Sequence, residues 1–173
     1  ARVGRQIAFS LDSTASRAEH SLTHDKPRFA FFQVFQPRGG GKRQAPTFDV
    51  IAPGVAKHEE EIVLAPGAEP AADPNLVLRV AVAAAEFGLP IAPGTLRNLK
   101  KCPIGDRNWT DESRELFIRL LASGPALLNV WEDIDFIDVP GKLIPEWLGV
   151  RNRPSASAAH RYTIDRHMVE VVT

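Results

Sequence analysis

The chain has 173 residues, of which 44% are hydrophobic, and its 21 basic and 21 acidic side chains give a formal net charge of zero. This length suits one ordinary domain, and the hydrophobic content is that of a globular chain rather than a disordered one. The balanced charge gives no global argument for a nucleic-acid partner, and no run approaches the roughly 20 apolar residues of a membrane span.

The charge is unevenly distributed, however. Residues 1–43 carry eight basic and three acidic side chains, whereas residues 45–73 carry one and six. This contrast fits either an intramolecular contact or two solvated loops, and we favour the loops. A single cysteine, Cys102, excludes an internal disulfide framework and is compatible with a cytoplasmic location. Lys100 and Lys101 could lower its pKa, but no motif makes it a nucleophile, so we expect an inert thiol.

Residues 1–47 are expected to form a helix followed by a flexible basic linker. Residues 3–18 space Val3, Ile7 and Leu11 for one helical face. The aromatic run at residues 29–35 predicts a short strand or an exposed anchor.

The glycine-rich segment at residues 37–44 is read as a mobile linker. It is not a phosphate-binding P-loop, because Gln36 and Arg43 stand where that motif needs a glycine and a serine or threonine.

Residues 48–72 predict a small β-hairpin. Its two apolar runs, residues 48–56 and 61–65, flank the polar segment Lys57-His58-Glu59-Glu60, and Pro53-Gly54 is expected to be a kink or an edge feature. His58 lies beside three glutamates, which could suggest a metal site. Consecutive carboxylates on a strand project to opposite faces, so we interpret this segment as a solvated turn.

Residues 73–154 predict a bundle of short helices. Asp73-Pro74 and Gly88 are start and stop signals for the first, and Thr110 caps a later one that Gly124 ends. The others are expected at residues 95–100, at residues 127–140 and from Leu143 to just before Pro154. The predicted fold class is therefore mainly α, with short helices in a bundle and a small β-hairpin near residues 48–65.

The last helix is expected in residues 155–173, with Thr163 or Asp165 as its cap. An apolar stripe then follows, and the sequence given stops soon after it begins. We therefore expect the front edge of a domain whose remainder lies elsewhere, with an exposed face that could drive self-association. The stripe consists of Met168, Val169, Val171 and Val172.

The run His-Arg-Tyr-Thr-Ile-Asp-Arg-His at residues 160–167, followed by an apolar helix, resembles the entry to the HD domain of bifunctional PII uridylyltransferase/uridylyl-removing enzymes. Residues 143–154 are similar to the segment that precedes this entry in that family. The helical signals in residues 73–90 and 109–137 are compatible with the family's interdomain linker, and the first seventy residues match only loosely the region after its nucleotidyltransferase domain.

The resemblance implies that His167 is the first metal ligand of the HD domain. Such a site also needs a later His-Asp pair and a further Asp, which do not follow in this sequence; His24-Asp25 lies far upstream. His160 would stand about 10 Å from His167 along a continuous helix, too far to share one ion. A single imidazole cannot hold a catalytic metal, so we expect no catalytic residue in this chain and an incomplete metal site at His167.

The transferase half of the family uses a phosphate loop followed by an Asp-x-Asp pair that holds magnesium. Asp133 and Asp135 form the only such pair here, but they lie in a helical pattern, where side chains two residues apart diverge by about 200°. We therefore interpret the pair as part of a solvated helix face.

The leading interpretation is a scaffolding segment of a cytoplasmic enzyme that attaches UMP or AMP to a PII protein and removes it hydrolytically. By resemblance, the parent would use Mg²⁺ or Mn²⁺ and a nucleoside triphosphate, while this segment holds no cofactor and contacts neither nucleic acid nor a membrane. A non-catalytic helical interaction module, binding through residues 29–35 or the terminal helix, is the alternative. A small metal phosphohydrolase is the third reading.

Overall fold

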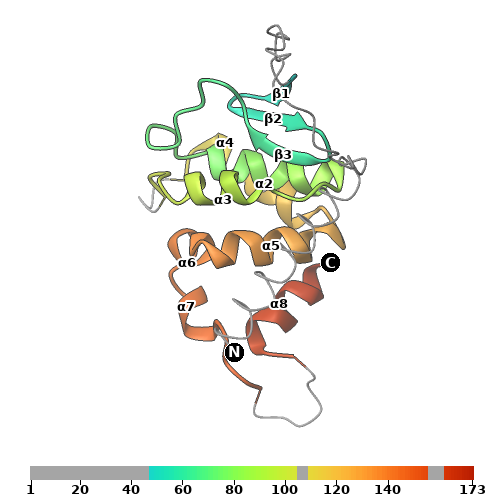
Figure 1. Cartoon of the computed structure of the whole chain (residues 1–173). Helices are drawn as coiled ribbons and strands as arrows, with labels where there is room; N and C mark the ends of the chain where they lie inside the picture. The colour runs from blue at the N-terminus through green and yellow to red at the C-terminus, as the bar shows by residue number, and fades with distance from the viewer. Residues whose placement is uncertain (1–46, 105–108, 156–161) are drawn as a thin grey trace, which may run out of the picture. The chain divides into compact units, whose positions relative to one another are not determined.

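A computed structural model of the chain describes residues 47–104, 109–155 and 162–173, all within the compact unit Thr47–Thr173 (Figure 1). The described part contains a three-stranded antiparallel sheet and seven helices, which confirms the mainly α prediction. The predictions for residues 3–18, 29–35 and 37–44 lie outside the described residues.

The sheet consists of β1 (Asp49–Ala52), β2 (Val55–His58) and β3 (Glu61–Leu64), paired in the order β1-β2-β3. The expected hairpin therefore has a third strand. Pro53-Gly54 is the turn between β1 and β2 rather than a kink, and Gly54 has the left-handed φ of +75° that glycine adopts readily. The second turn is Glu59-Glu60, so Lys57 and His58 belong to a strand, not to a solvated turn.

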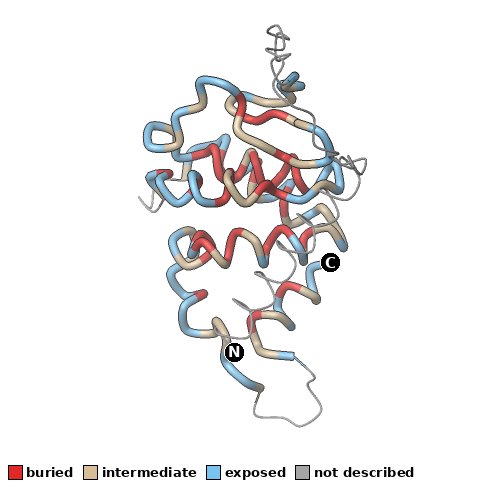
Figure 2. Tube along the Cα trace, in the orientation of Figure 1, coloured by how far each residue is buried: buried red, intermediate tan, exposed pale blue. Residues whose placement is uncertain are grey.

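Helix α2 (Leu76–Phe87) packs against all three strands and is the centre of the core. Ala and Val dominate its sequence, and most of its residues are buried, which the red colour marks in Figure 2. It ends at Gly88, whose left-handed φ of 63° confirms the predicted C-cap. At its start, Asp73 Oδ1 accepts a hydrogen bond from the backbone N–H of Asn75 at 3.1 Å, and Asn75 holds the cap position that we expected for Asp73.

Helices α3 (Pro93–Leu99) and α4 (Asp111–Leu121) follow. The segment before α3 extends the sheet through a bridge between Ile62 and Ile91. Thr110 caps α4 as predicted, because its side chain accepts from the backbone N–H of Ser113 at 3.1 Å. Helix α4 lies against α2 and buries Leu116 and Leu120.

Residues 126–150 form three helices, whereas the sequence predicts two helices in this part of the chain. Helix α5 (Ala126–Phe136) buries Leu127, Trp131 and Ile134, and the chain then turns at Asp138, which has a left-handed φ of 64°. Helix α6 (Val139–Leu143) starts there with Pro140 in its first turn, so the proline opens a helix instead of ending one. Helix α7 (Trp147–Val150) is only one turn long.

Helix α8 (Ile164–Val172) lies against α5 and α7 (Figure 1). Its inner side buries Asp165 and Val169, whereas the apolar side chains Met168, Val171 and Val172 are exposed. In the part of the chain that the structure describes, none of the helices has the length and apolarity needed to cross a membrane.

Candidate functional site

A buried polar network joins α5 and α7, and Asp135 is at its centre. This side chain is 2% exposed and accepts a hydrogen bond from the Trp147 indole N–H at 2.9 Å. The Arg151 guanidinium lies 3.0 Å from the same carboxylate and also bonds Asp138 at 2.5 Å. The prediction that Asp135 belongs to a solvated helix face is therefore wrong, although the prediction that it lies in a helix is confirmed.

Helical periodicity explains why Asp135 points inward. It follows Trp131 by four residues, and residues four apart share a helix face. Burial disfavours the charge on Arg151, but the hydrogen bond to Asp138 and the charge of Asp135 outweigh it, so the pKa of Arg151 is raised above its usual value. The Asp135 carboxylate is thus engaged in a buried ion pair and in a hydrogen bond to Trp147.

A second buried carboxylate, Asp165, holds the start of α8. It is 1% exposed; one oxygen accepts from the Asn152 backbone N–H at 2.7 Å and the other from the Arg166 backbone N–H at 2.9 Å. Thr163 occupies the N-cap position, but its side chain makes no capping bond. Of the two predicted capping residues, Asp165 therefore carries the side-chain contacts.

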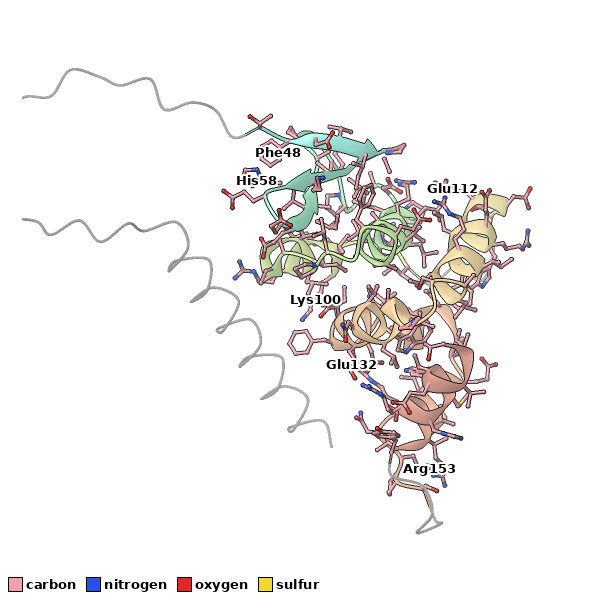
Figure 3. The ribbon with its side chains drawn as sticks, turned by 90° about the vertical axis from the view of Figure 1, so that its right-hand side faces the viewer. Phe48, His58, Lys100, Glu112, Glu132 and Arg153 are labelled. Carbon is pink, nitrogen blue, oxygen red and sulfur yellow. The ribbon has the colours of Figure 1, made fainter. Side chains whose placement is uncertain are left out.

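Arg166 ties α8 to α5. It forms an ion pair with Glu132 of α5 and donates a hydrogen bond to Glu170 at 2.9 Å (Figure 3 labels Glu132). Burial again opposes the charge, while Glu170 and Glu132 favour it, and the net result is a raised pKa for Arg166. Helix α8 is therefore attached to its neighbours by charged contacts as well as by Val169.

His167 lies on the outer side of α8, where its side chain is exposed. Its backbone N–H donates to the Thr163 carbonyl at 2.9 Å, an ordinary first-turn helix bond. Among the described residues, no group of three or more His, Cys, Asp and Glu side chains is arranged to hold a metal ion. The described residues therefore do not form a metal site, and His160 and His24-Asp25 lie outside them.

A groove of about 250 Å³ lies between β1, α2 and α4. Arg79 borders it and donates to the Pro53 carbonyl at 3.0 Å and to Glu112 at 2.5 Å, and it also pairs with Asp73. The hydrogen bond from Asn75, followed by that from Arg79, lowers the pKa of Glu112. These contacts hold the β1–β2 turn and α4 against α2. The Glu112 carboxylate, labelled in Figure 3, accepts hydrogen bonds from both Asn75 and Arg79.

Cys102 is buried, and burial together with the negative charge of Asp73 raises the pKa of its thiol to about 11. This result supports the expectation of an inert thiol. The basic side chains that oppose this rise in pKa are Lys142 and Arg79, not the expected Lys100 and Lys101.

The raised pKa predicts slow thiol chemistry. At pH 8 we expect the folded chain to react with a disulfide reagent such as DTNB at least about 100-fold more slowly than the urea-unfolded chain, because the thiolate is the nucleophile. Absorbance of the released thiolate measures both rates. Equal rates in the folded and unfolded chain would contradict the assignment.

The chain was compared with known proteins. It is 36% identical over 168 residues to the bifunctional uridylyltransferase/uridylyl-removing enzyme of Streptomyces coelicolor, a match that covers 96% of the chain and 20% of that enzyme. The enzyme of the same name from Mycobacterium tuberculosis is 42% identical over 118 residues, covering 68% of the chain and 15% of the enzyme. That from Corynebacterium glutamicum is 34% identical over 100 residues, covering 58% and 14%.

No protein-family model and no solved structure matches the chain. The curated relatives nevertheless agree in name, and the chain spans about a fifth or less of the length of each. The resemblance drawn from the sequence is confirmed: the chain is a homologue of one segment of the actinobacterial bifunctional uridylyltransferase/uridylyl-removing enzymes.

Proposed function

We propose that this chain is the interdomain helical region, with the start of the HD domain, of an enzyme that attaches UMP or AMP to a PII protein and removes it hydrolytically. The segment holds the two activities in place and does not catalyse either reaction itself. The observation that carries this proposal is the coverage, since 96% of the chain matches a relative whose printed name gives both activities, yet the match takes up only 20% of that relative.

The buried carboxylates support a scaffolding role. Metal-dependent transfer or hydrolysis needs carboxylates or imidazoles that converge on an ion. Asp135 instead holds Trp147 and Arg151, and Asp165 holds two backbone N–H groups. Both side chains therefore stabilise the fold.

His167 is proposed as one metal ligand of the longer protein, in which residues outside this chain complete the site. Its exposed position on α8 leaves the imidazole accessible to them. A bound Mg²⁺ or Mn²⁺ would supply Lewis-acid activation of water. The nucleoside triphosphate and the PII protein bind to other parts of the same longer, cytoplasmic protein.

The exposed apolar face of α8 indicates that another protein surface covers it. Met168, Val171 and Val172 are 47%, 72% and 50% exposed, which is unusual for neighbouring apolar side chains. In the proposed parent, further helices of the HD domain cover this face. The alternative function, a non-catalytic interaction module, would use the same face to bind another protein or a second copy, and it predicts a 173-residue chain that is stable and monomeric or specifically paired.

Substitution of His167 tests the proposal in the longer protein. We expect His167→Gln to reduce removal of the nucleotidyl group by about 100-fold or more, because loss of even an indirect contact to a metal costs about 10–100-fold. Attachment of the group should change less than about twofold. Release and incorporation of labelled nucleotide on a PII protein measure the two rates separately.

His58→Gln is the matched control, since His58 is also a histidine at the surface but lies on β2, where its ring bonds the Thr47 carbonyl at 3.1 Å. It should leave both rates unchanged. Unchanged removal by His167→Gln would refute the role of His167.

A further inference from the structure

The first turn of α8 is fixed by two hydrogen bonds to the chain that leaves α7. Asp165 Oδ2 accepts from the Asn152 backbone N–H at 2.7 Å, and the Ile164 N–H donates to the Arg153 carbonyl at 2.9 Å. Asn152 has a left-handed φ of 59°, an uncommon conformation for a residue other than glycine. Asn152 and Arg153, which follow α7, therefore hold the start of α8 through two hydrogen bonds.

The chain that leaves α7 is itself fixed to α5. Arg151 directly precedes Asn152 and bonds the buried Asp135 carboxylate, while Arg166 directly follows Asp165 and pairs with Glu132. These contacts form a closed set, which we call the three-helix clamp: Glu132 and Asp135 of α5, Arg151 and Asn152 after α7, and Asp165 and Arg166 of α8. Figure 3 labels Glu132 near the middle of the described unit and Arg153 at its lower end.

The three-helix clamp sets the rotation of α8 about its own axis. Successive helical residues are about 100° apart, so a residue two positions after Asp165 lies about 200° around the helix. With Asp165 and Val169 buried, His167 is exposed on the opposite side. If α8 were rotated differently about its axis, His167 would no longer be exposed opposite Asp165 and Val169. The surroundings of the apolar side chains Met168 and Val171 would change as well.

We propose that Asp165 is a positioning residue for His167: it fixes the start of α8 against Asn152 and so directs the imidazole outward, toward the rest of the longer protein. This inference rests on the proposed role of His167. Asp165 acts through the helix, because its carboxylate is buried and accepts from the Asn152 and Arg166 backbone N–H groups.

The two acceptor bonds explain why a carboxylate is needed. An asparagine side chain would be the same size as that of Asp165, but an amide has one oxygen and one NH₂ group. In an Asp165→Asn variant, one of the two backbone N–H groups would therefore face another donor. The substitution loosens the start of α8 while it leaves the imidazole of His167 unchanged.

The test uses the longer protein with Asp165→Asn. We expect faster amide hydrogen exchange at Asn152 and in residues 164–172, and Mn²⁺ binding that is weakened about 10–100-fold, as for other residues that orient a ligand. Exchange is measured by mass spectrometry, and Mn²⁺ binding by titration without substrate. Removal of the nucleotidyl group should fall in parallel, and attachment should stay unchanged.

Glu112→Gln is the matched control, because it weakens another hydrogen-bonded carboxylate, on α4, in contact with Asn75 and Arg79. It should leave exchange in α8 and Mn²⁺ binding unchanged, whatever it does to stability. If Asp165→Asn does not accumulate as folded protein, Asp165→Ser, which keeps one acceptor in a smaller side chain, is measured in the same way against the same expectations.

Unchanged Mn²⁺ binding in the Asp165 variant, in a protein where His167→Gln abolishes it, would overturn the positioning role alone. Unchanged Mn²⁺ binding and removal in His167→Gln would instead overturn the proposed function on which this inference rests.

Discussion

Replacement of Asp135 by alanine is expected to lower the free energy of unfolding of the chain by about 3–5 kcal/mol, the cost of removing one partner from a buried ion pair. The Arg151 side chain is only 14% exposed and the Asp135 side chain 3%. In the variant the guanidinium keeps Asp138 but loses its buried partner, and the Trp147 indole N–H loses its acceptor. Urea-induced unfolding followed by tryptophan fluorescence measures the change.

Asp133→Ala is the matched control for this prediction. Asp133 lies two residues earlier on α5 and is only partly buried, so we expect a change below about 1 kcal/mol. Equal effects of the two substitutions would mean that Asp135 is not the centre of the network.

Leu120→Ala is expected to cost about 2–5 kcal/mol, the range for a fully buried leucine truncated in a core. Leu120 is 0% exposed on α4, the helix that lies against α2, and its loss leaves a cavity between those helices. Thermal and urea unfolding of the chain measure the effect.

Ile118→Ala on the same helix is the control, since Ile118 is 65% exposed. It should change the free energy of unfolding by less than about 0.5 kcal/mol. A larger loss at Ile118 than at Leu120 would show that α4 presents its other face to α2.

Local signals in the sequence predicted much of the fold. Gly88 and Thr110 mark helix ends because a left-handed glycine and a hydroxyl cap act within one turn of the chain. The Pro53-Gly54 turn also has a local signal, since proline followed by glycine is typical of a type II turn, although we predict a kink or an edge feature there from the sequence.

The role of Asp135 could not be predicted in the same way. Its partners Trp147 and Arg151 lie 12 and 16 residues later, and only the turn at Asp138 brings them back to α5. One signal was present: Asp135 follows Trp131 by four residues and so shares its buried face. A polar residue on an apolar stripe is a candidate for a buried ion pair, and this criterion would have separated Asp135 from Asp133.

The site was predictable only in part. The sequence placed His167 in the first turns of a helix, and the structure agrees, with His167 on the exposed side of α8. The role of Asp165 as a contact to Asn152 was missed, because the two residues are separated by a connection whose path the sequence does not specify.

The central claim is that this segment supports two activities and performs neither. The most direct measurement compares the 173-residue chain with the longer protein in one assay, with a PII protein, nucleoside triphosphate and Mn²⁺. We predict that the longer protein attaches and removes the nucleotidyl group, and that the chain alone does neither. Metal-dependent removal by the chain alone would contradict the claim and would favour a small metal phosphohydrolase.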